Sequence, residues 1–210
     1  MGRMESQWVG IVDKPIPLEG PTFEETIYIT PTREPPVLQA EIKTMVEQGA
    51  RALGLTWGAF HAEARITSNG PVLLEIAGRP IGGVCSRLHT YCLGSDYNEL
   101  IVRAALGEVV AIEPAGLTPA GVMMLPVPRP GRITRITGVD EARSIEGVRD
   151  MLIFVKPGDI LRSFPEQGSC LGVILATGPT TDEVQQTLER SHAQLHFEIE
   201  SGSVANFTPA

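Results

Sequence analysis

Residues 58–83 read GAFHAEARITSNGPVLLEIAGRPIGG, and this stretch decides the fold of the first part of the chain. Two strand-like runs, 58–66 and 71–77, flank the pair Asn69-Gly70. An Asn-Gly pair between two such runs is the strongest short-range signal for a β-hairpin. The sequence therefore predicts two antiparallel strands joined by a tight turn at Asn69-Gly70.

Each predicted strand carries one glutamate in a largely apolar setting, Glu63 on the first strand and Glu75 on the second. Side chains alternate between the faces of a strand, so Leu74 and Ile76 are expected on the face opposite to Glu75. Two buried carboxylates are costly unless a cation compensates their charge. Because Mg²⁺ binds carboxylate oxygens together with substrate phosphates, the pair predicts a metal site. The alternative is a half-exposed sheet on which both glutamates face solvent.

An arginine, Arg79, follows the second strand in a glycine-rich segment with Gly78, Gly82 and Gly83. Its planar guanidinium donates hydrogen bonds in a fork that suits phosphate oxygens. Glycine lacks a Cβ atom, so the backbone here is able to approach a ligand closely. This arrangement predicts an arginine that binds phosphate near the two glutamates; the alternative is a surface ion pair.

The same stretch resembles the C-terminal signature of ATP-grasp carboxylate–amine ligases, and most closely that of L-amino-acid ligases (dipeptide synthetases). The resemblance implies that Glu63 and Glu75 chelate Mg²⁺, or Mn²⁺, that bridges the phosphates of ATP. It also implies that Arg79 contacts the phosphate and the acyl intermediate, as a catalytic and cofactor-binding residue. The family often has Asn two positions after the second acid. Here Ala77 stands there, so one metal ligand is missing or is supplied otherwise.

Two earlier segments extend the resemblance. Asp13-Lys14-Pro15 resembles the segment whose lysine faces the nucleotide phosphates, which makes Lys14 a cofactor-binding candidate. Phe23-Glu24-Glu25-Thr26 resembles the next strand, where the acid before Thr lies near the bound amino acid; Glu25 is therefore a catalytic candidate that positions the amine. The alternatives are a solvated turn lysine for Lys14 and a charge at a strand edge for Glu25.

The remaining pattern predicts an α+β fold with many short elements. An apolar stripe predicts an amphipathic helix over 38–53, closed by Gly54. The other elements expected are strands over 8–12, 23–30, 132–137, 151–155 and 170–177, and helices over 96–106 and 181–196, with Thr181 capping the last helix. A proline-rich stretch places a domain boundary near residue 112.

The resemblance implies the C-terminal lobe of an ATP-grasp domain (an antiparallel sheet with helices) over 1–112. A small α/β domain of the L-amino-acid-ligase type follows over 113–210, where residues 121–199 carry the looser part of the resemblance. Complete ATP-grasp ligases are longer, and the half that clamps adenine precedes the region matched here. We therefore expect a chain that lacks that half.

Three further sets of residues are weaker candidates. His192 and His196 are four positions apart on the predicted last helix and could hold a metal ion, although a solvated helix face is the better interpretation. Cys85 and Cys92 could act as a nucleophile or a ligand pair; their surroundings favour reduced structural thiols. His61, beside Glu63, could act as a base, but a hydrogen-bonded structural histidine is the better interpretation.

The composition excludes some classes of partner. The formal net charge is -8 and the pI is about 5.0, which argues against nucleic acid or an anionic membrane, because both require a basic face. No run approaches the length of a membrane span, and the N-terminus lacks an apolar segment of signal-peptide type. We expect a cytoplasmic protein.

The predicted function is the metal- and phosphate-handling half of an ATP-dependent carboxylate–amine ligase that acts through an acyl phosphate. The substrates would be amino acids or other small carboxylates. One alternative is a truncated, non-catalytic lobe that serves in binding or dimerisation, and another is one subunit of a split ligase. We expect a homo-oligomer, or docking to the missing N-terminal half.

Overall fold

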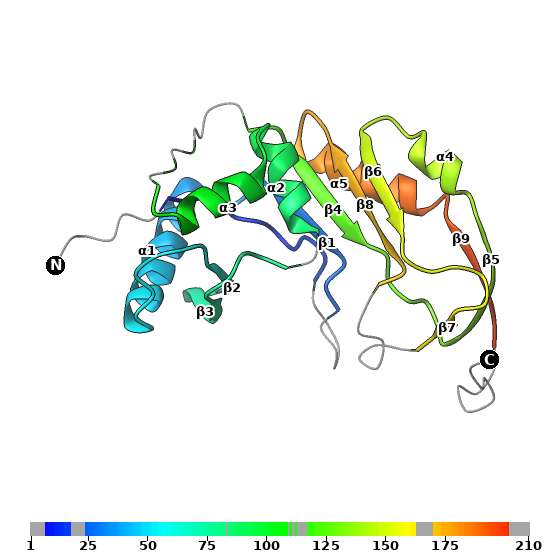
Figure 1. Ribbon diagram of the computed structural model, residues 1–210, viewed down its shortest axis with the longest axis horizontal. Helices are drawn as coiled ribbons and strands as arrows, with labels where there is room; N and C mark the ends of the chain where they lie inside the picture. Colours follow the sequence, from blue (N-terminus) through cyan, green and yellow to red (C-terminus); the bar gives the residue numbers. More distant parts are fainter. Residues whose placement is uncertain are drawn as a thin grey trace. The chain divides into compact units, whose positions relative to one another are not determined.

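The computed structural model describes residues 7–17, 24–82, 84–108, 110, 112, 117–162 and 170–201 (Figure 1). The chain forms two compact units, Met1–Ile11 with Pro31–Leu117, and Val12–Thr30 with Thr118–Ala210. The segment Val12–Thr30, which carries Lys14 and Glu25, thus belongs to the second unit, whereas the sequence analysis assigned it to the first domain. The family-based domain assignment, 1–112 and 113–210, stays a prediction.

The first unit combines a hairpin with three helices. Its elements are α1 (Pro36–Ala52), β2 (His61–Thr67), β3 (Gly70–Ala77), α2 (Cys85–Leu93) and α3 (Tyr97–Ala105). Helix α1 begins with Pro36, whose fixed φ suits the first turn of a helix, and buries Ile42, Val46 and Ala50 at a spacing of four. Gly54 follows the helix with φ 71°. The predicted helix over 38–53 is confirmed.

Helices α2 and α3 pack on each other. Asp96 caps α3, because its side chain accepts a hydrogen bond of 2.9 Å from the backbone N–H of Asn98. The rings of His89 on α2 and Tyr97 on α3 lie 4.8 Å apart. The sequence analysis predicted α3 and did not predict α2, whose buried face consists of two cysteines, a leucine and a histidine.

The second unit holds two antiparallel sheets. Its strands are β1 (Ile27–Thr30), β4 (Ala120–Met124), β5 (Gly131–Thr137), β6 (Val148–Ile153), β7 (Ile160–Leu161), β8 (Gly172–Thr177) and β9 (His196–Glu200). The larger sheet has the order β1-β4-β8-β6 and the smaller one the order β7-β5-β9. Helices α4 (Val139–Arg143) and α5 (Thr181–His192) complete the unit (Figure 1). Helix α5 packs on β1, β4 and β8.

Close packing of α5 depends on a glycine in β4. A Cβ atom on Gly121 would lie 2.6 Å from Cγ1 of Val184 and 2.9 Å from Cδ1 of Leu188. Both of these α5 side chains are fully buried, so the helix lies directly on the strand. Antiparallel sheets with helices confirm the predicted α+β class.

Two predictions about single elements were wrong. Residues 8–12 form no strand; only Asp13 pairs with Ile29, through backbone bonds of 2.8 and 3.0 Å. The last helix ends at His192 and is capped by Thr180, not Thr181. Beyond it, Leu195, Phe197 and Ile199 are buried or half-buried and alternate with exposed residues. This period of two favours the strand β9 over a continued helix.

Of the helices in the described ranges, none combines the length and the apolar character that crossing a membrane requires.

Candidate functional site

The register of the hairpin brings the two glutamates together. Glu63 on β2 and Glu75 on β3 are direct cross-strand partners, and the pair two positions nearer the open end of the hairpin is His61 and Ala77. Directly opposed residues of an antiparallel pair project from the same face of the sheet. One face of the hairpin therefore carries Glu63, Glu75 and His61.

A β-bulge lies beside the glutamates. Glu63 pairs with Glu75, but Ala64 pairs with Leu73, so Leu74 is the extra residue of β3. Leu74 is 58% exposed, and the expectation that it shares a face with Ile76 was wrong. The sequence pattern could not reveal this, because an extra residue shifts the alternation by one position. Bulges of this kind are frequent next to active sites, where they change the direction of a side chain.

The opposite face of the hairpin packs on α1 through a glycine. A Cβ atom on Gly49 would lie 2.7 Å from side-chain atoms of both Leu73 and Ile76. The hairpin thus lies close against the helix on its apolar face, which leaves the glutamates on the other face. This asymmetry confirms the prediction that Glu63 and Glu75 project together from one side.

Arg79 follows β3 in a tight turn held by three hydrogen bonds. Its backbone N–H donates to the carbonyl of Ala77 at 2.8 Å. Its guanidinium Nη1 donates to the carbonyl of Pro80 at 3.1 Å. Nδ1 of His61 lies 3.0 Å from the Arg79 carbonyl oxygen. Since a carbonyl oxygen only accepts, the Nδ1–H group is the donor in this last bond.

The hairpin face provides two hard oxygen ligands for a divalent cation. Within the ranges that the structure describes, no three His, Cys, Asp or Glu side chains gather as a metal-binding group. Mg²⁺ is usually bound through one or two carboxylates, while water and substrate phosphates complete its shell. The donor set of Glu63 and Glu75 fits that mode of binding and does not fit a closed, all-protein site.

A second polar cluster lies in the other unit. Glu25 accepts a hydrogen bond from Lys14 Nζ at one carboxylate oxygen and from the Tyr28 hydroxyl at the other. The Lys14 ammonium also lies 5.6 Å from the centre of the Tyr28 ring, within the range of a cation–π contact. The structure therefore brings the two predicted residues of this unit together.

Tyr28 is the member of this cluster that the sequence analysis missed. It is 8% exposed and lies in β1, three positions after Glu25. The pairing of Asp13 with Ile29 brings the backbone of Lys14 beside this strand. A tyrosine in an otherwise aliphatic strand was the available signal, because a buried tyrosine hydroxyl needs a hydrogen-bond partner.

The weaker candidates do not form sites. His192 ends α5 and His196 begins β9, so the predicted pair on one helix is wrong. Burial lowers the pKa of His192. Cys85 and Cys92 are buried, and neither forms a disulfide with a described residue. His89, between them on α2, has its pKa lowered by burial to about 4, so this histidine is neutral at physiological pH.

Of the glycines expected near a ligand, Gly83 lies outside the described residues. A Cβ atom on Gly82 would lie 3.6 Å from Nη1 of Arg79, so the guanidinium is folded over this segment. Phe23, next to the Glu24-Glu25 pair, also lies outside the described residues.

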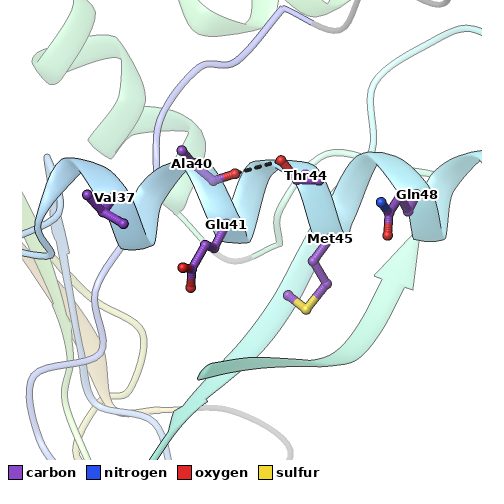
Figure 2. Close-up of a pocket in the computed structure, with 6 residues that line it drawn as sticks. All are labelled: Val37, Ala40, Glu41, Thr44, Met45 and Gln48. Atoms are coloured by element: carbon purple, nitrogen blue, oxygen red, sulfur yellow. Dashed lines mark hydrogen bonds between the residues drawn. The ribbon is translucent and has the colours of Figure 1, made fainter. Parts of the chain in front are cut away.

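A shallow depression of about 580 Å³ lies along one face of α1 (Figure 2). Its lining residues are Val37, Ala40, Glu41, Thr44, Met45 and Gln48. The hydroxyl of Thr44 is bonded to the Ala40 carbonyl at 2.9 Å. No residue predicted for the site lines this depression.

Two family models match the chain in order. The ATP-grasp domain model matches residues 5–88, which contain Lys14, Glu25, Glu63, Glu75 and Arg79. The model described as L-amino acid ligase C-terminal domain 2 matches residues 123–200.

Among curated proteins, the dapdiamide A synthase of Enterobacter agglomerans is 30% identical over 148 residues, which are 67% of this chain and 35% of that protein. The chain spans about a third of the length of the curated relatives that it matches.

Two solved structures show the fold. The L-amino acid ligase from Bacillus licheniformis has a TM-score of 0.76 and 24% identity, over 87% of this chain and 46% of that one. The second is the biotin carboxylase domain dimer of the Hydrogenobacter thermophilus 2-oxoglutarate carboxylase, solved in complex with ADP, its magnesium salt and bicarbonate. It has a TM-score of 0.65 and 15% identity, over 91% of this chain and 42% of that one. With both family models matched in chain order, this chain belongs to the ATP-grasp superfamily, among the proteins related to the L-amino acid ligases.

Proposed function

We propose that this chain is the metal- and phosphate-handling part of an ATP-dependent carboxylate–amine ligase that acts through an acyl phosphate. The observation that carries the proposal is the direct pairing of Glu63 with Glu75 across the hairpin, on the face away from α1. Two carboxylates held against each other repel. Such a pair is reasonable where a cation compensates the charge, as in a family whose members bind ATP with Mg²⁺.

Glu63 and Glu75 would hold Mg²⁺, or Mn²⁺, together with the phosphates of ATP. When bound, the ion neutralises the charge that develops as the γ-phosphoryl group moves to a substrate carboxylate. The two glutamates come from paired strands that pack on α1, so their backbone positions are set by the sheet. A scaffold of this kind holds the two carboxylates in fixed positions relative to each other.

Arg79 would bind the transferred phosphoryl group and the acyl phosphate that results. Its backbone is fixed at the N–H and at the carbonyl, while its guanidinium carries one bond to the Pro80 carbonyl. A guanidinium has five N–H donors. The bond to Pro80 therefore leaves donors for phosphate oxygens.

Glu25 would position the amine that attacks the acyl phosphate. Both of its oxygens accept hydrogen bonds, from Lys14 and Tyr28, which fixes the plane of the carboxylate. A carboxylate offers about four lone-pair sites, so two bonds still allow a further contact with a substrate ammonium group. Lys14, which is paired with Glu25, would also bind a nucleotide phosphate through its positive charge.

The substrates proposed are ATP, an amino acid or other small carboxylate, and an amine. The dapdiamide A synthase and L-amino acid ligase relatives support this class of substrate. The proposed location is cytoplasmic, and the proposed assembly is a homo-oligomer or a complex with a chain that carries the nucleotide-clamping lobe.

The test is amide formation, with release of phosphate from ATP, by this chain alone and mixed with a candidate partner chain. We expect turnover that requires Mg²⁺ and an amino acid, and that is lost in the variant Glu75→Gln. Normal turnover by Glu75→Gln in a competent mixture would remove the proposal.

A non-catalytic binding or dimerisation module is the second candidate. The first unit exposes large apolar side chains; Trp57 is 74% exposed and Leu53 is 64% exposed. Exposed apolar patches favour association with another protein. Self-association without magnesium-dependent phosphate binding would favour this second candidate.

A further inference from the structure

The last backbone pair of the hairpin is His61 with Ala77, where β2 begins and β3 ends. Beyond this pair the chain leaves the sheet and turns toward Arg79. The hydrogen bond from His61 Nδ1 to the Arg79 carbonyl, at 3.0 Å, joins the two sides of the hairpin one step further. A side chain thus continues the ladder where the backbone pairing stops.

We propose that His61 is a positioning residue for Arg79, and this rests on the phosphate-binding role proposed for Arg79. The bond ties the arginine to the strand that carries Glu63, two positions from His61 on the same face. The spacing between the arginine and the glutamate pair is then set by β2 as well as by β3. Among the described residues, the other hydrogen bonds of Arg79 lie within the turn that follows β3.

The other restraints on Arg79 are local and cannot replace this one. Its N–H bonds the carbonyl of Ala77 and its guanidinium bonds the carbonyl of Pro80, both within two positions in the chain. These bonds shape the turn but move with it. The His61 bond spans 18 positions and is the contact described here that anchors the turn to the neighbouring strand.

The bond is exposed, so its net contribution to folding stability is expected to be small. Its effect on ligand binding is expected to be larger, because a small displacement of Arg79 would weaken the interaction of the guanidinium with a phosphate. The two effects therefore separate: removing the bond should leave the fold nearly unchanged and should weaken phosphate binding.

The second ring nitrogen offers a rival interpretation. Within the described residues, Nε2 of His61 has no hydrogen-bond partner, and it lies on the face of the glutamates, where it could contact a ligand directly. Two substitutions distinguish the roles. Asn places an amide N–H group near the position of Nδ1 and has nothing at Nε2, whereas Gln places its amide near Nε2.

The experiment uses this chain and magnesium tripolyphosphate as the probe, with binding and the Nε–H signal of Arg79 followed by NMR. We expect His61→Leu to weaken binding by at least about threefold and to broaden or shift the Arg79 signal, while His61→Asn stays close to wild type. Arg79→Gln should weaken binding by about tenfold, the order expected for one charge-assisted hydrogen bond. Thermal midpoints of all variants report whether the fold survives.

The outcomes separate the two proposals. Wild-type binding by a folded His61→Leu variant, with an unchanged Arg79 signal, overturns the positioning role and leaves the proposed function intact. Rescue by Gln and not by Asn overturns it too, in favour of direct contact through Nε2. Unchanged binding by Arg79→Gln, or no magnesium-dependent binding by wild type, instead contradicts the proposed function.

Discussion

Glu63 and Glu75 are direct cross-strand partners on the face of the hairpin that points away from Gly49 and Ile76. Like charges in this relationship destabilise a sheet, by roughly 0.2–1 kcal/mol. Glu75 is exposed on this face, so solvent weakens the repulsion, and a bound cation would compensate it. This relationship leads directly to a prediction with two opposite parts.

Glu75→Gln should stabilise the metal-free chain slightly and should abolish its stabilisation by Mn²⁺ or Mg²⁺. Glutamine keeps the shape of the side chain but removes the charge that repels Glu63 and binds the ion. Thermal midpoints with and without metal measure both effects. Glu41→Gln, an exposed change on α1, is the control and should alter neither. Metal stabilisation of Glu75→Gln equal to that of wild type would exclude Glu75 as a ligand.

Tyr28→Phe should destabilise the second unit by about 1 kcal/mol, the usual net contribution of one hydrogen bond. The change removes the donor to one oxygen of Glu25 and leaves the ring in place. Urea midpoints measure the loss, and Tyr91→Phe on α2 is the matched control. In an active ligase, the Michaelis constant for the amine should rise more than the turnover number falls. A variant as stable as wild type would show that Tyr28 does not hold Glu25 in solution.

Gly49→Val should destabilise the first unit by about 1–3 kcal/mol, which is typical of overpacking. The added side chain would overlap Leu73 and Ile76, since even a Cβ atom lies 2.7 Å from each. Valine has a higher helix propensity than glycine, so a loss of stability in Gly49→Val is not a propensity effect. Gln48→Val, on the exposed neighbouring position, places valine in α1 without the overlap and should have the higher urea midpoint. Equal midpoints would mean that α1 and the hairpin separate easily.

His89 should make the chain less stable as the pH falls from about 6.5 to about 4. Burial lowers the pKa of His89 from 6.5 to about 4 in the folded state, so the unfolded chain binds the proton first across this range. The contribution of His89 to the free energy of unfolding is therefore fully present above pH 6.5 and is lost progressively on acidification. Below about pH 4 this contribution no longer changes. The total loss is on the order of 3 kcal/mol.

The measurement for His89 is the free energy of unfolding against pH for wild type and His89→Leu. The variant should lose less stability between pH 6.5 and 4, because its buried side chain does not titrate. His196→Gln, an exposed change at the start of β9, is the control and should follow the wild-type curve. Identical slopes for wild type and His89→Leu would contradict the burial of a neutral histidine on α2.

Local sequence patterns predicted the two strands of the hairpin and α1. The turn lies one position earlier than predicted, at Ser68-Asn69, because Thr67 pairs with Gly70. The bulge at Leu74, which the sequence pattern does not reveal, sets Glu63 opposite Glu75. The spacing of Ile42, Val46 and Ala50 determined the buried stripe of α1. These features depend on residues that are close in the sequence, where turn chemistry and periodicity act directly.

Where the sequence pattern fits both a helix and a strand, tertiary contacts determine which element forms. The sequence favoured one helix over 181–196, but pairing with β5 makes residues from His196 onward a strand. The bulge at Leu74 lies between Leu73 and Ile76, which both pack against α1 at Gly49. In both places the burial of apolar side chains against a distant element overrides the local pattern.

The sequence alone identified Lys14, Glu25, Glu63, Glu75 and Arg79 as candidates, because residue type and spacing carry the family signature. Only the tertiary structure showed that Lys14 and Tyr28 hold Glu25, and that His61 bonds the Arg79 carbonyl. The physical reason is distance along the chain. A hydrogen bond across 18 positions depends on strand register, and register is set by long-range pairing that no local pattern of residues contains.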